Sequence, residues 1–182
     1  DYYLQEIIDR MDNGLIKVIT GIRRCGKSYL LNTIFKNYLL EQGIDEKHII
    51  QLSLDENMNK KFLDPDVLDE HIRKLIKDEK KYFIILDEVQ KVKEFESVLI
   101  GFMHISNVDI YVTGSNSKFL SSDIITEFRG RGDEIKVYPL SFSEFYSIYD
   151  GSEEKALNEY YIYGGLPLAV LAKTENAKTN YL

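Results

Sequence analysis

Residues 21–28 have the types and the spacing that binding of a polyphosphate requires. They read G-I-R-R-C-G-K-S and fit the pattern G-x-x-x-x-G-K-[ST]. The two glycines allow positive φ angles and let backbone N–H groups approach phosphate oxygens with no Cβ in the way. Lys27 supplies a positive charge for the β- and γ-phosphates, and the Ser28 hydroxyl is a small oxygen ligand suited to Mg²⁺. The motif therefore predicts a site for nucleotide and Mg²⁺.

The surrounding sequence supports this interpretation over a glycine turn with an unrelated lysine. An apolar, β-branched run at 15–20 precedes the loop, and the apolar residues of 29–35 recur at helical spacing. A helix that begins at Lys27 directs its partial positive charge at the same anion. Cys25 is either an activated thiol or the occupant of a permissive position. The expected nucleotide contacts are Gly21, Ile22, Arg23, Arg24, Cys25, Gly26, Lys27, Ser28 and Tyr29.

Two adjacent carboxylates, Asp87 and Glu88, follow the unbroken apolar run 82–86. Such a run is typical of a central parallel strand that is covered on both faces. In phosphate-loop NTPases an acidic residue at this strand end holds Mg²⁺ beside the loop serine, and a second carboxylate can orient and deprotonate water. We assign Asp87 to the metal, with Ser28, and Glu88 to the water. Two solvated charges at the start of a loop are the alternative. Gln90 could contact the water or a partner, but it is interpreted as a polar surface residue.

Polar residues also end the next expected strand, 108–113. Thr113, Ser115 and Asn116 lie at this end, where a side chain could reach the γ-phosphate or the attacking water. Ser115 or Asn116 is the candidate for this role, although T-G-S-N is also a common turn composition. Further on, Arg129 and Arg131 flank a glycine, and a guanidinium there could stabilise charge on a transferring phosphoryl group. The alternative is an ordinary arginine at a helix end.

Strands and helices alternate along the chain, which predicts an α/β fold: three α/β/α layers around a five-stranded parallel sheet. One strand intervenes between the loop strand and the acidic strand, as in NTPases with an additional strand, and the expected sheet order is 5-1-4-3-2. Strands are expected at 15–20, 48–54, 82–86, 108–113 and 134–138. Helices are expected at 2–11, 27–41, 64–76, 94–105, 121–128, 141–149 and 153–163, with a polar loop at 55–61.

The composition suits one α/β domain with a small appendage. We expect a core over 1–138, which includes an amino-terminal helix 2–12, and the start of a helical lid over 139–182 that the chain truncates. The net charge of −7 argues against a basic nucleic-acid surface, so nucleic acid would bind only through a missing part. The longest apolar run is well short of the ~20 residues that span a bilayer, so no membrane is expected. A single cysteine suits the cytoplasm.

With these residues in place, the chain resembles the extended AAA-type ATPases. It is most similar to bacterial and archaeal predicted ATPases in which this domain precedes a C-terminal domain of restriction-endonuclease-like fold. The similarity includes I-L-D-E-V-Q at 85–90, P-L-S-F-S-E-F at 139–145, and G-R at 130–131, which implies that Arg131 is the catalytic arginine. The segment G-G-L-P at 164–167 also resembles the G-L-P motif of NB-ARC signalling NTPases, which implies that Pro167 contacts the adenine.

The leading functional hypothesis is a Mg²⁺-dependent ATPase, which binds ATP and releases ADP. Its catalytic residues would be Lys27, Glu88, Asn116 and Arg131. Hydrolysis would drive or gate a conformational change in the attached C-terminal domain or in a partner, and a homo-oligomer could supply Arg131 in trans. The alternative is a nucleotide-gated interaction switch with negligible turnover. A GTPase is disfavoured, because the chain lacks N-K-x-D at the expected position, and a small-molecule kinase is disfavoured, because the tail shows no obvious lid for an acceptor.

Overall fold

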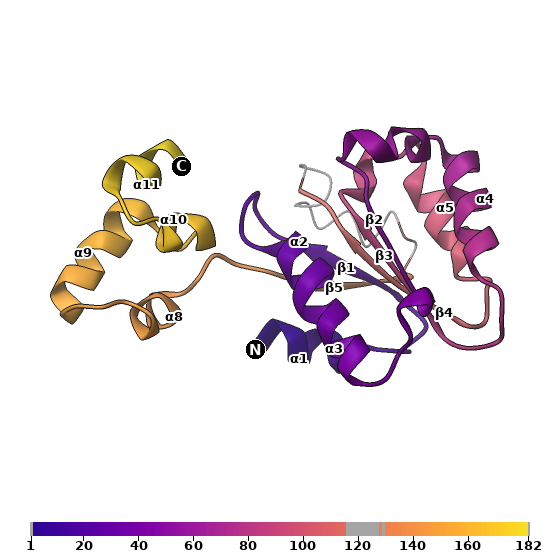
Figure 1. Ribbon diagram of the computed structural model, residues 1–182, viewed down its shortest axis with the longest axis horizontal. Helices are drawn as coiled ribbons and strands as arrows, with labels where there is room; N and C mark the ends of the chain where they lie inside the picture. Colours follow the sequence, from indigo (N-terminus) through magenta and orange to yellow (C-terminus); the bar gives the residue numbers. More distant parts are fainter. Residues whose placement is uncertain (1, 116–127, 129, 182) are drawn as a thin grey trace. The chain divides into compact units, whose positions relative to one another are not determined.

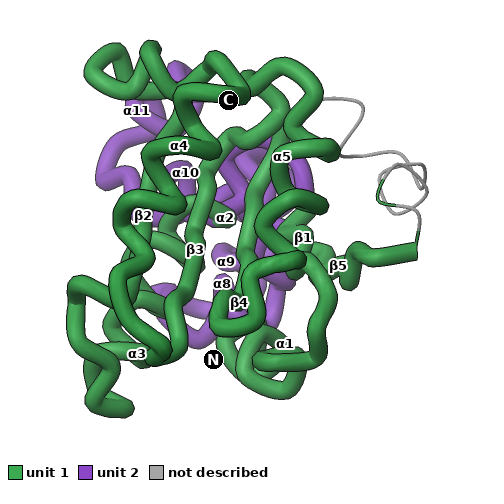
Figure 2. The backbone as a smooth tube through the Cα atoms, turned by 90° about the vertical axis from the view of Figure 1, so that its right-hand side faces the viewer, with its two compact units in different colours: residues 1–20, 27–136 green, residues 21–26, 137–182 purple. Residues whose placement is uncertain are grey.

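The computed structural model describes residues 2–115, 128 and 130–181. The chain divides into two compact units (Figure 2). We call residues 1–20 and 27–136 the α/β unit, and residues 21–26 and 137–182 the helical unit. The predicted helix 121–128 lies outside the described residues except for its last position. None of the described helices combines the length and the apolar character that crossing a bilayer requires.

A five-stranded parallel sheet forms the centre of the α/β unit (Figure 1). Its strands are β1 (Ile16–Thr20), β2 (Ile49–Ser53), β3 (Tyr82–Asp87), β4 (Val108–Thr113) and β5 (Gly132–Lys136). Their order is β2-β3-β4-β1-β5, which confirms the predicted topology. The last strand begins and ends two residues earlier than expected, because it pairs with β1 from Ile16–Gly132 to Thr20–Lys136 and its ladder stops where β1 stops.

Helices cover both faces of this sheet (Figures 1 and 2). The α-helices are α1 (Tyr2–Ile8), α2 (Lys27–Tyr29), α3 (Lys36–Glu41), α4 (Pro65–Leu75) and α5 (Phe95–Phe102). Between α2 and α3 the predicted helix 27–41 continues as a π-helical segment, η1 (Leu30–Phe35). Short 3₁₀ segments are η2 (Glu46–His48), η3 (Asn57–Leu63) and η4 (Val89–Lys91), of which η3 occupies part of the predicted loop 55–61.

The alternation of side chains along β3 and β4 decides which residues meet the helix after the loop. On β3, Ile84 and Leu86 belong to the core on the α4 and α5 side. On the opposite face the Phe35 ring lies 6.4 Å from that of Phe83 and 4.5 Å from that of Tyr111. Because side chains alternate with a period of two, the odd-numbered residues of β3 and β4 point toward the helix 27–41.

A buried ion pair between Lys17 and Asp109 joins β1 to β4. Asp109 Oδ2 also accepts hydrogen bonds from the Tyr111 hydroxyl, at 2.7 Å, and from the Asp12 N–H, at 3.0 Å. Burial lowers the pKa of Lys17 from its usual value, against the opposing effect of the Asp109 carboxylate. The pair therefore needs both of its members, because either charge alone would be buried without compensation.

We expect Lys17→Met to lower the free energy of unfolding by about 3–5 kcal/mol, as for other buried pairs that lose one partner. Lys81→Met is the control, since it removes an ion pair with Asp12 whose side chains are 33% and 56% exposed. That control should cost less than about 1 kcal/mol. Urea unfolding of both variants measures the difference, and equal losses would show that burial of the Lys17 pair is energetically unimportant.

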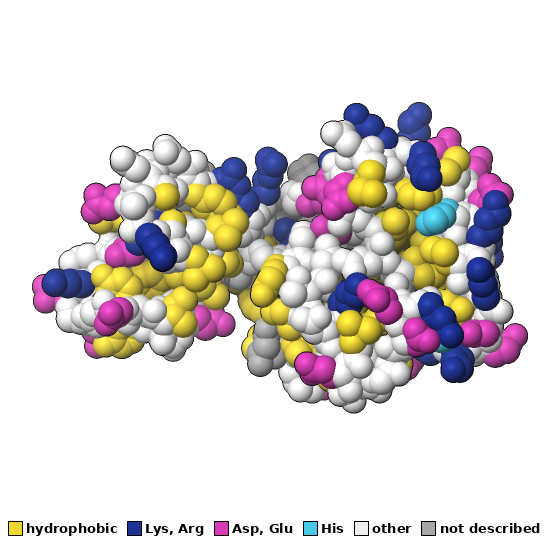
Figure 3. All heavy atoms as spheres, viewed as in Figure 1, with side chains coloured by type: hydrophobic (Ala, Val, Ile, Leu, Met, Phe, Trp, Pro, Cys, Tyr) yellow, Lys and Arg dark blue, Asp and Glu magenta, His cyan; other side chains and the backbone are white. Residues whose placement is uncertain are grey.

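The helical unit contains α8 (Phe142–Ser147), α9 (Glu153–Tyr163), α10 (Pro167–Leu171) and α11 (Glu175–Tyr181). A capping box between Ser141 and Glu144 starts α8. Aromatic rings join α8 to α9, with the Phe145 ring 5.4 Å from that of Tyr160. Gly165 permits a close approach, because an added Cβ would lie 2.0 Å from the Leu140 carbonyl oxygen. Figure 3 shows apolar side chains on this unit; the exposed ones include Ile148, Leu157, Tyr161, Ile162, Leu168 and Leu171.

Candidate functional site

The backbone of the glycine loop takes conformations that few residue types allow. Gly21 and Gly26 have φ angles of 143° and 103°, and Arg24 between them has φ of 70°. The first glycine is also required by space, because a Cβ on Gly21 would lie 2.2 Å from the Val137 carbonyl oxygen. The loop therefore adopts positive φ at both glycines, which is the property that brings backbone N–H groups toward an anion.

Several loop side chains pack within the helical unit. Cys25 is buried and its Sγ donates a hydrogen bond to the Val137 carbonyl oxygen at 3.5 Å, surroundings that do not favour an activated thiol. Arg24 places its guanidinium 4.6 Å from the centre of the Tyr181 ring and donates a hydrogen bond to the Tyr181 carbonyl oxygen. Pro167 lies beside Gly26, since its Cγ would be 3.8 Å from a Cβ added there. The adenine contact of Pro167 stays a prediction.

The remaining loop side chains differ in exposure. Ile22 and Tyr29 are 47% and 63% exposed, and Arg23 is exposed as well. Lys27 is only 4% exposed although it carries a charged side chain. Ser28 is exposed, and its hydroxyl donates a hydrogen bond to Asp87 Oδ1 at 2.9 Å. This bond brings together the two predicted metal ligands, which are 59 residues apart in the sequence.

Asp87 is the buried centre of the acidic site. It is 5% exposed, and it accepts hydrogen bonds from Ser28, from the Thr113 hydroxyl and, at 3.4 Å, from Asn32 Nδ2. Burial raises the pKa of the Asp87 carboxyl, while the hydrogen bonds from Thr113 and Ser28 act in the opposite direction. A carboxylate that is desolvated in this way gains from a nearby cation.

The donor set around Asp87 fits a hard cation. Carboxylate and hydroxyl oxygens are the ligands that Mg²⁺ prefers. Asn32 Oδ1 is a further buried oxygen, with no hydrogen-bond partner among the described residues. Asn32 was not predicted as a site residue. It lies four residues after Ser28, one helical turn further on, and this spacing was the available signal.

Glu88 begins the next segment in a left-handed conformation. Its φ and ψ are 56° and 44°, which is uncommon for a residue other than glycine, asparagine or aspartate. Its N–H donates to Thr113 Oγ1 at 3.1 Å, and its Oε2 accepts from Ser115 Oγ at 2.9 Å. Gln90 Nε2 donates to the same Oε2. The interpretation of Gln90 as a surface residue is therefore wrong: it is half-buried and fixes the Glu88 carboxylate.

The structure places Arg131 away from this site. The Arg131 carbonyl oxygen accepts a hydrogen bond from the Ile16 N–H at 2.8 Å, and Ile16 is the first residue of β1. Asp87 and Thr113 are the last residues of their strands. In a parallel sheet, Arg131 therefore lies at the amino ends of the strands. Asp87 lies at the carboxyl ends, about 16 Å away along a five-residue strand. Asn116 lies outside the described residues.

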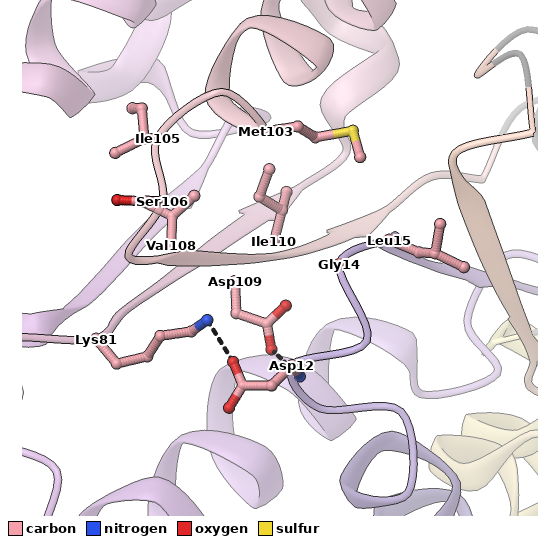
Figure 4. Close-up of a pocket in the computed structure, with 10 residues that line it drawn as sticks. All are labelled: Asp12, Gly14, Leu15, Lys81, Met103, Ile105, Ser106, Val108, Asp109 and Ile110. Carbon is pink, nitrogen blue, oxygen red and sulfur yellow. Dashed lines mark hydrogen bonds and ion pairs between the residues drawn. The ribbon is translucent and has the colours of Figure 1, made fainter.

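A cavity of about 200 Å³ also lies at the amino ends of the strands (Figure 4). It is bounded by the start of β4 and by the segments that precede β1 and β3. Figure 4 shows Lys81 directed toward Asp12, and the Asp12 N–H bonded to Asp109. These polar groups are thus engaged with one another, and the cavity is separate from the residues around Asp87.

The amino-acid sequence has relatives in both a bacterium and an archaeon. An uncharacterised protein of Haemophilus influenzae is 36% identical over 176 residues, which are 93% of this chain and 44% of that protein. An uncharacterised protein of Methanocaldococcus jannaschii is 32% identical over 183 residues, covering 92% of this chain and 39% of that protein. The chain thus spans less than half the length of these two relatives.

Solved structures share the fold at low sequence identity. The ADP form of the Aeropyrum pernix ORC2 protein has a TM-score of 0.58 at 12% identity and covers 99% of this chain and 63% of that chain. The DNA polymerase III gamma subunit-related protein of Thermotoga maritima has a TM-score of 0.56 at 10% identity, covering 97% and 57%. These similarities support the arrangement of sheet and helices described above.

A sequence model of the family described as "AAA domain" matches residues 13–146. The matched segment contains the glycine loop, the acidic end of β3 and all five strands of the parallel sheet. The pairing of Ser28 with Asp87 lies within it as well. On this match and this fold, the chain belongs to the AAA domain family.

Proposed function

We propose that this domain binds ATP and ADP together with Mg²⁺ and hydrolyses ATP. The observation that carries the proposal is the 2.9 Å hydrogen bond between Ser28 and Asp87, with Glu88 held beside them by Thr113, Ser115 and Gln90. One hydroxyl and one carboxylate that meet in this way form half of a Mg·nucleotide site. The other half, which binds the phosphates, is supported by the family match and by the positive-φ glycine loop.

Each residue has a role that follows from its chemistry. The loop amides of residues 21–26 and the Lys27 ammonium bind the phosphates, and Ser28 and Asp87 hold the metal. When bound, Mg²⁺ supplies positive charge that neutralises the charge developing on the phosphates. Glu88 orients the attacking water and accepts its proton at Oε1, since Ser115 and Gln90 both donate their hydrogen bonds to Oε2. Pro167 contacts the base, and Asn116 contacts the γ-phosphate or the water.

A second candidate, the nucleotide-gated switch with negligible turnover, is favoured by the position of Arg131. Because Arg131 lies at the amino ends of the strands, away from Asp87, its guanidinium would act on the nucleotide of a second copy. An isolated chain would then bind nucleotide and turn over slowly. We propose that homo-oligomerisation completes the site, and that hydrolysis drives or gates a change in the segment that the longer relatives carry. Any nucleic-acid contact would also belong to that segment.

The proposal predicts opposite effects of Asp87→Asn on stability and on binding. Because burial raises the pKa of Asp87 above 3.8, the stability of the nucleotide-free protein falls as pH rises from 3.8 through this raised pKa. Asparagine removes the buried charge, and its amide can donate to the unpartnered Asn32 Oδ1. At pH 7 we therefore expect Asp87→Asn to have a higher Tm than wild type. The rise should be about 2–4 °C for each kcal/mol that the substitution adds to the free energy of unfolding.

The same variant should bind Mg·ATP more weakly than wild type. Loss of an outer-shell partner of a metal costs about 10- to 100-fold in affinity, and loss of the direct ligand Asp87 should cost more than that. Calorimetric titration with Mg·ATP, and with ATP plus EDTA, measures the metal-dependent part. Asp69→Asn is the control, because Asp69 pairs with Arg73 on the surface of α4 and should change neither quantity. Unchanged Mg·ATP affinity in Asp87→Asn would contradict the proposed metal site.

A further inference from the structure

A single hydroxyl at the end of β4 joins the two acidic residues. Thr113 is fully buried, and its Oγ1 accepts the Glu88 N–H at 3.1 Å. The same Oγ1 donates a hydrogen bond to Asp87 Oδ1. A threonine hydroxyl has one proton, so this bonding pattern uses its single donor on one acidic residue and an acceptor position on the other.

The register of the sheet explains why Thr113 reaches both residues. Leu86 of β3 pairs with Val112 of β4, so the next residues, Asp87 and Thr113, are neighbours at the carboxyl ends of adjacent strands. Both are odd-numbered and both point toward the helix that carries Ser28. The side chain at position 113 therefore has a fixed place between the carboxylate of Asp87 and the backbone turn at Glu88.

The turn at Glu88 needs an anchor of this kind. A left-handed conformation costs roughly 1–2 kcal/mol for a residue with a Cβ, so it persists only where surrounding contacts impose it. The hydrogen bond from the Glu88 N–H to Thr113 is one such contact. Without the hydroxyl, this N–H would lose its acceptor and Asp87 would lose one of its donors, and both acidic side chains could shift from their present positions.

We propose that Thr113 is a positioning residue for catalysis, which holds the metal-binding carboxylate of Asp87 and the water-activating Glu88 in one fixed geometry. This inference rests on the proposed ATPase function. Thr113 itself does not touch the nucleotide in this role, because its hydroxyl is occupied by the two acidic residues. Its loss should therefore affect turnover and the metal requirement more than the affinity for the nucleotide itself.

The test compares Thr113→Val, which keeps the shape and removes the hydroxyl, with Thr113→Ser, which keeps the hydroxyl. Thr113→Val should lower kcat about 10- to 100-fold and raise the Mg²⁺ concentration for half-maximal rate, as loss of outer-shell partners does. The dissociation constant of metal-free ADP should stay within about twofold. Thr113→Ser should restore kcat to within about threefold of wild type.

Tyr111→Phe is the matched control for stability. It removes another buried hydroxyl on the same face of β4. That hydroxyl donates to the Asp109 carboxylate, which lies nearer the amino end of the strand. It should leave kcat and the Mg²⁺ midpoint unchanged. The proposal is overturned if Thr113→Val keeps both quantities at wild-type values, or if Thr113→Ser is as defective as Thr113→Val.

A readout without turnover separates this inference from the proposed function. Amide hydrogen exchange of Glu88 in nucleotide-free protein should be at least about tenfold faster in Thr113→Val than in wild type, because the N–H loses its acceptor. Tyr111→Phe should not change it. Absence of Mg·ATP hydrolysis by the wild type would refute the ATPase proposal, whereas unchanged Glu88 exchange in Thr113→Val would refute the positioning role even in an active enzyme.

Discussion

Replacing Lys27 by methionine is expected to weaken Mg·ATP binding about 10- to 150-fold, which corresponds to the loss of 1.5–3 kcal/mol for a hydrogen bond to a charged group. The effect on kcat/KM should be larger, about 10²–10³-fold, because positive charge matters most where negative charge develops. Lys27 is 4% exposed, so methionine, which preserves most of the aliphatic stem, leaves the packing close to that of the parent.

Lys36→Met is the control for this experiment. Lys36 lies nine residues further along the same helical segment and pairs with Glu46 at 2.8 Å, so its removal deletes an equal charge away from the loop. Isothermal titration with Mg·ATP and Mg·ADP gives the affinities, and phosphate release gives kcat/KM. If Lys27→Met binds both nucleotides as tightly as Lys36→Met, the phosphate site is not where the motif places it.

The main features of this site could be predicted because they depend on local sequence. The glycine loop, the apolar run before Asp87 and the alternation of strands with helices each lie within a short segment, and together they predicted the sheet order that the structure has. The role of Thr113 depends instead on the register between β3 and β4. A register shift of two residues would keep the same faces but bring Tyr111 beside Asp87, and no local pattern distinguishes these two registers.

The start of β5 was hidden by the composition of the strand. This strand begins with Gly132 and Asp133, which are residue types depleted in strands, so the sequence pattern placed its start at 134. Arg131 precedes the strand with either start, so the predicted strand itself already implied a position at the amino end, away from Asp87; the catalytic assignment followed the family resemblance instead. The helix α11 was missed for a related reason, because E-N-A-K-T-N-Y offers only a weak apolar stripe.

The second large effect is expected for Glu88→Gln, which should lower kcat about 10²–10⁴-fold, the usual contribution of a general base. Nucleotide affinity should stay near that of wild type, because the glutamine carbonyl can accept the hydrogen bonds that Ser115 and Gln90 now donate to Oε2. The amide nitrogen then occupies the place of Oε1, where it cannot accept a proton from water. Glutamine should also adopt the backbone conformation of position 88, with φ of 56°, as readily as glutamate does.

Glu94→Gln is a close control for this substitution. Among the residues that the structure describes, Glu94 is the other glutamate with positive φ, at 50°, and it is exposed at the start of α5. Single-turnover hydrolysis of Mg·ATP by wild type and both variants, alone and at concentrations that favour self-association, separates the two candidate functions. An ATPase requires wild type and Glu94→Gln to be fast and Glu88→Gln to be slow. If all three are equally slow under every condition while binding Mg·ATP with equal affinity, Glu88 does not activate water in this chain and the domain acts as a nucleotide-gated switch.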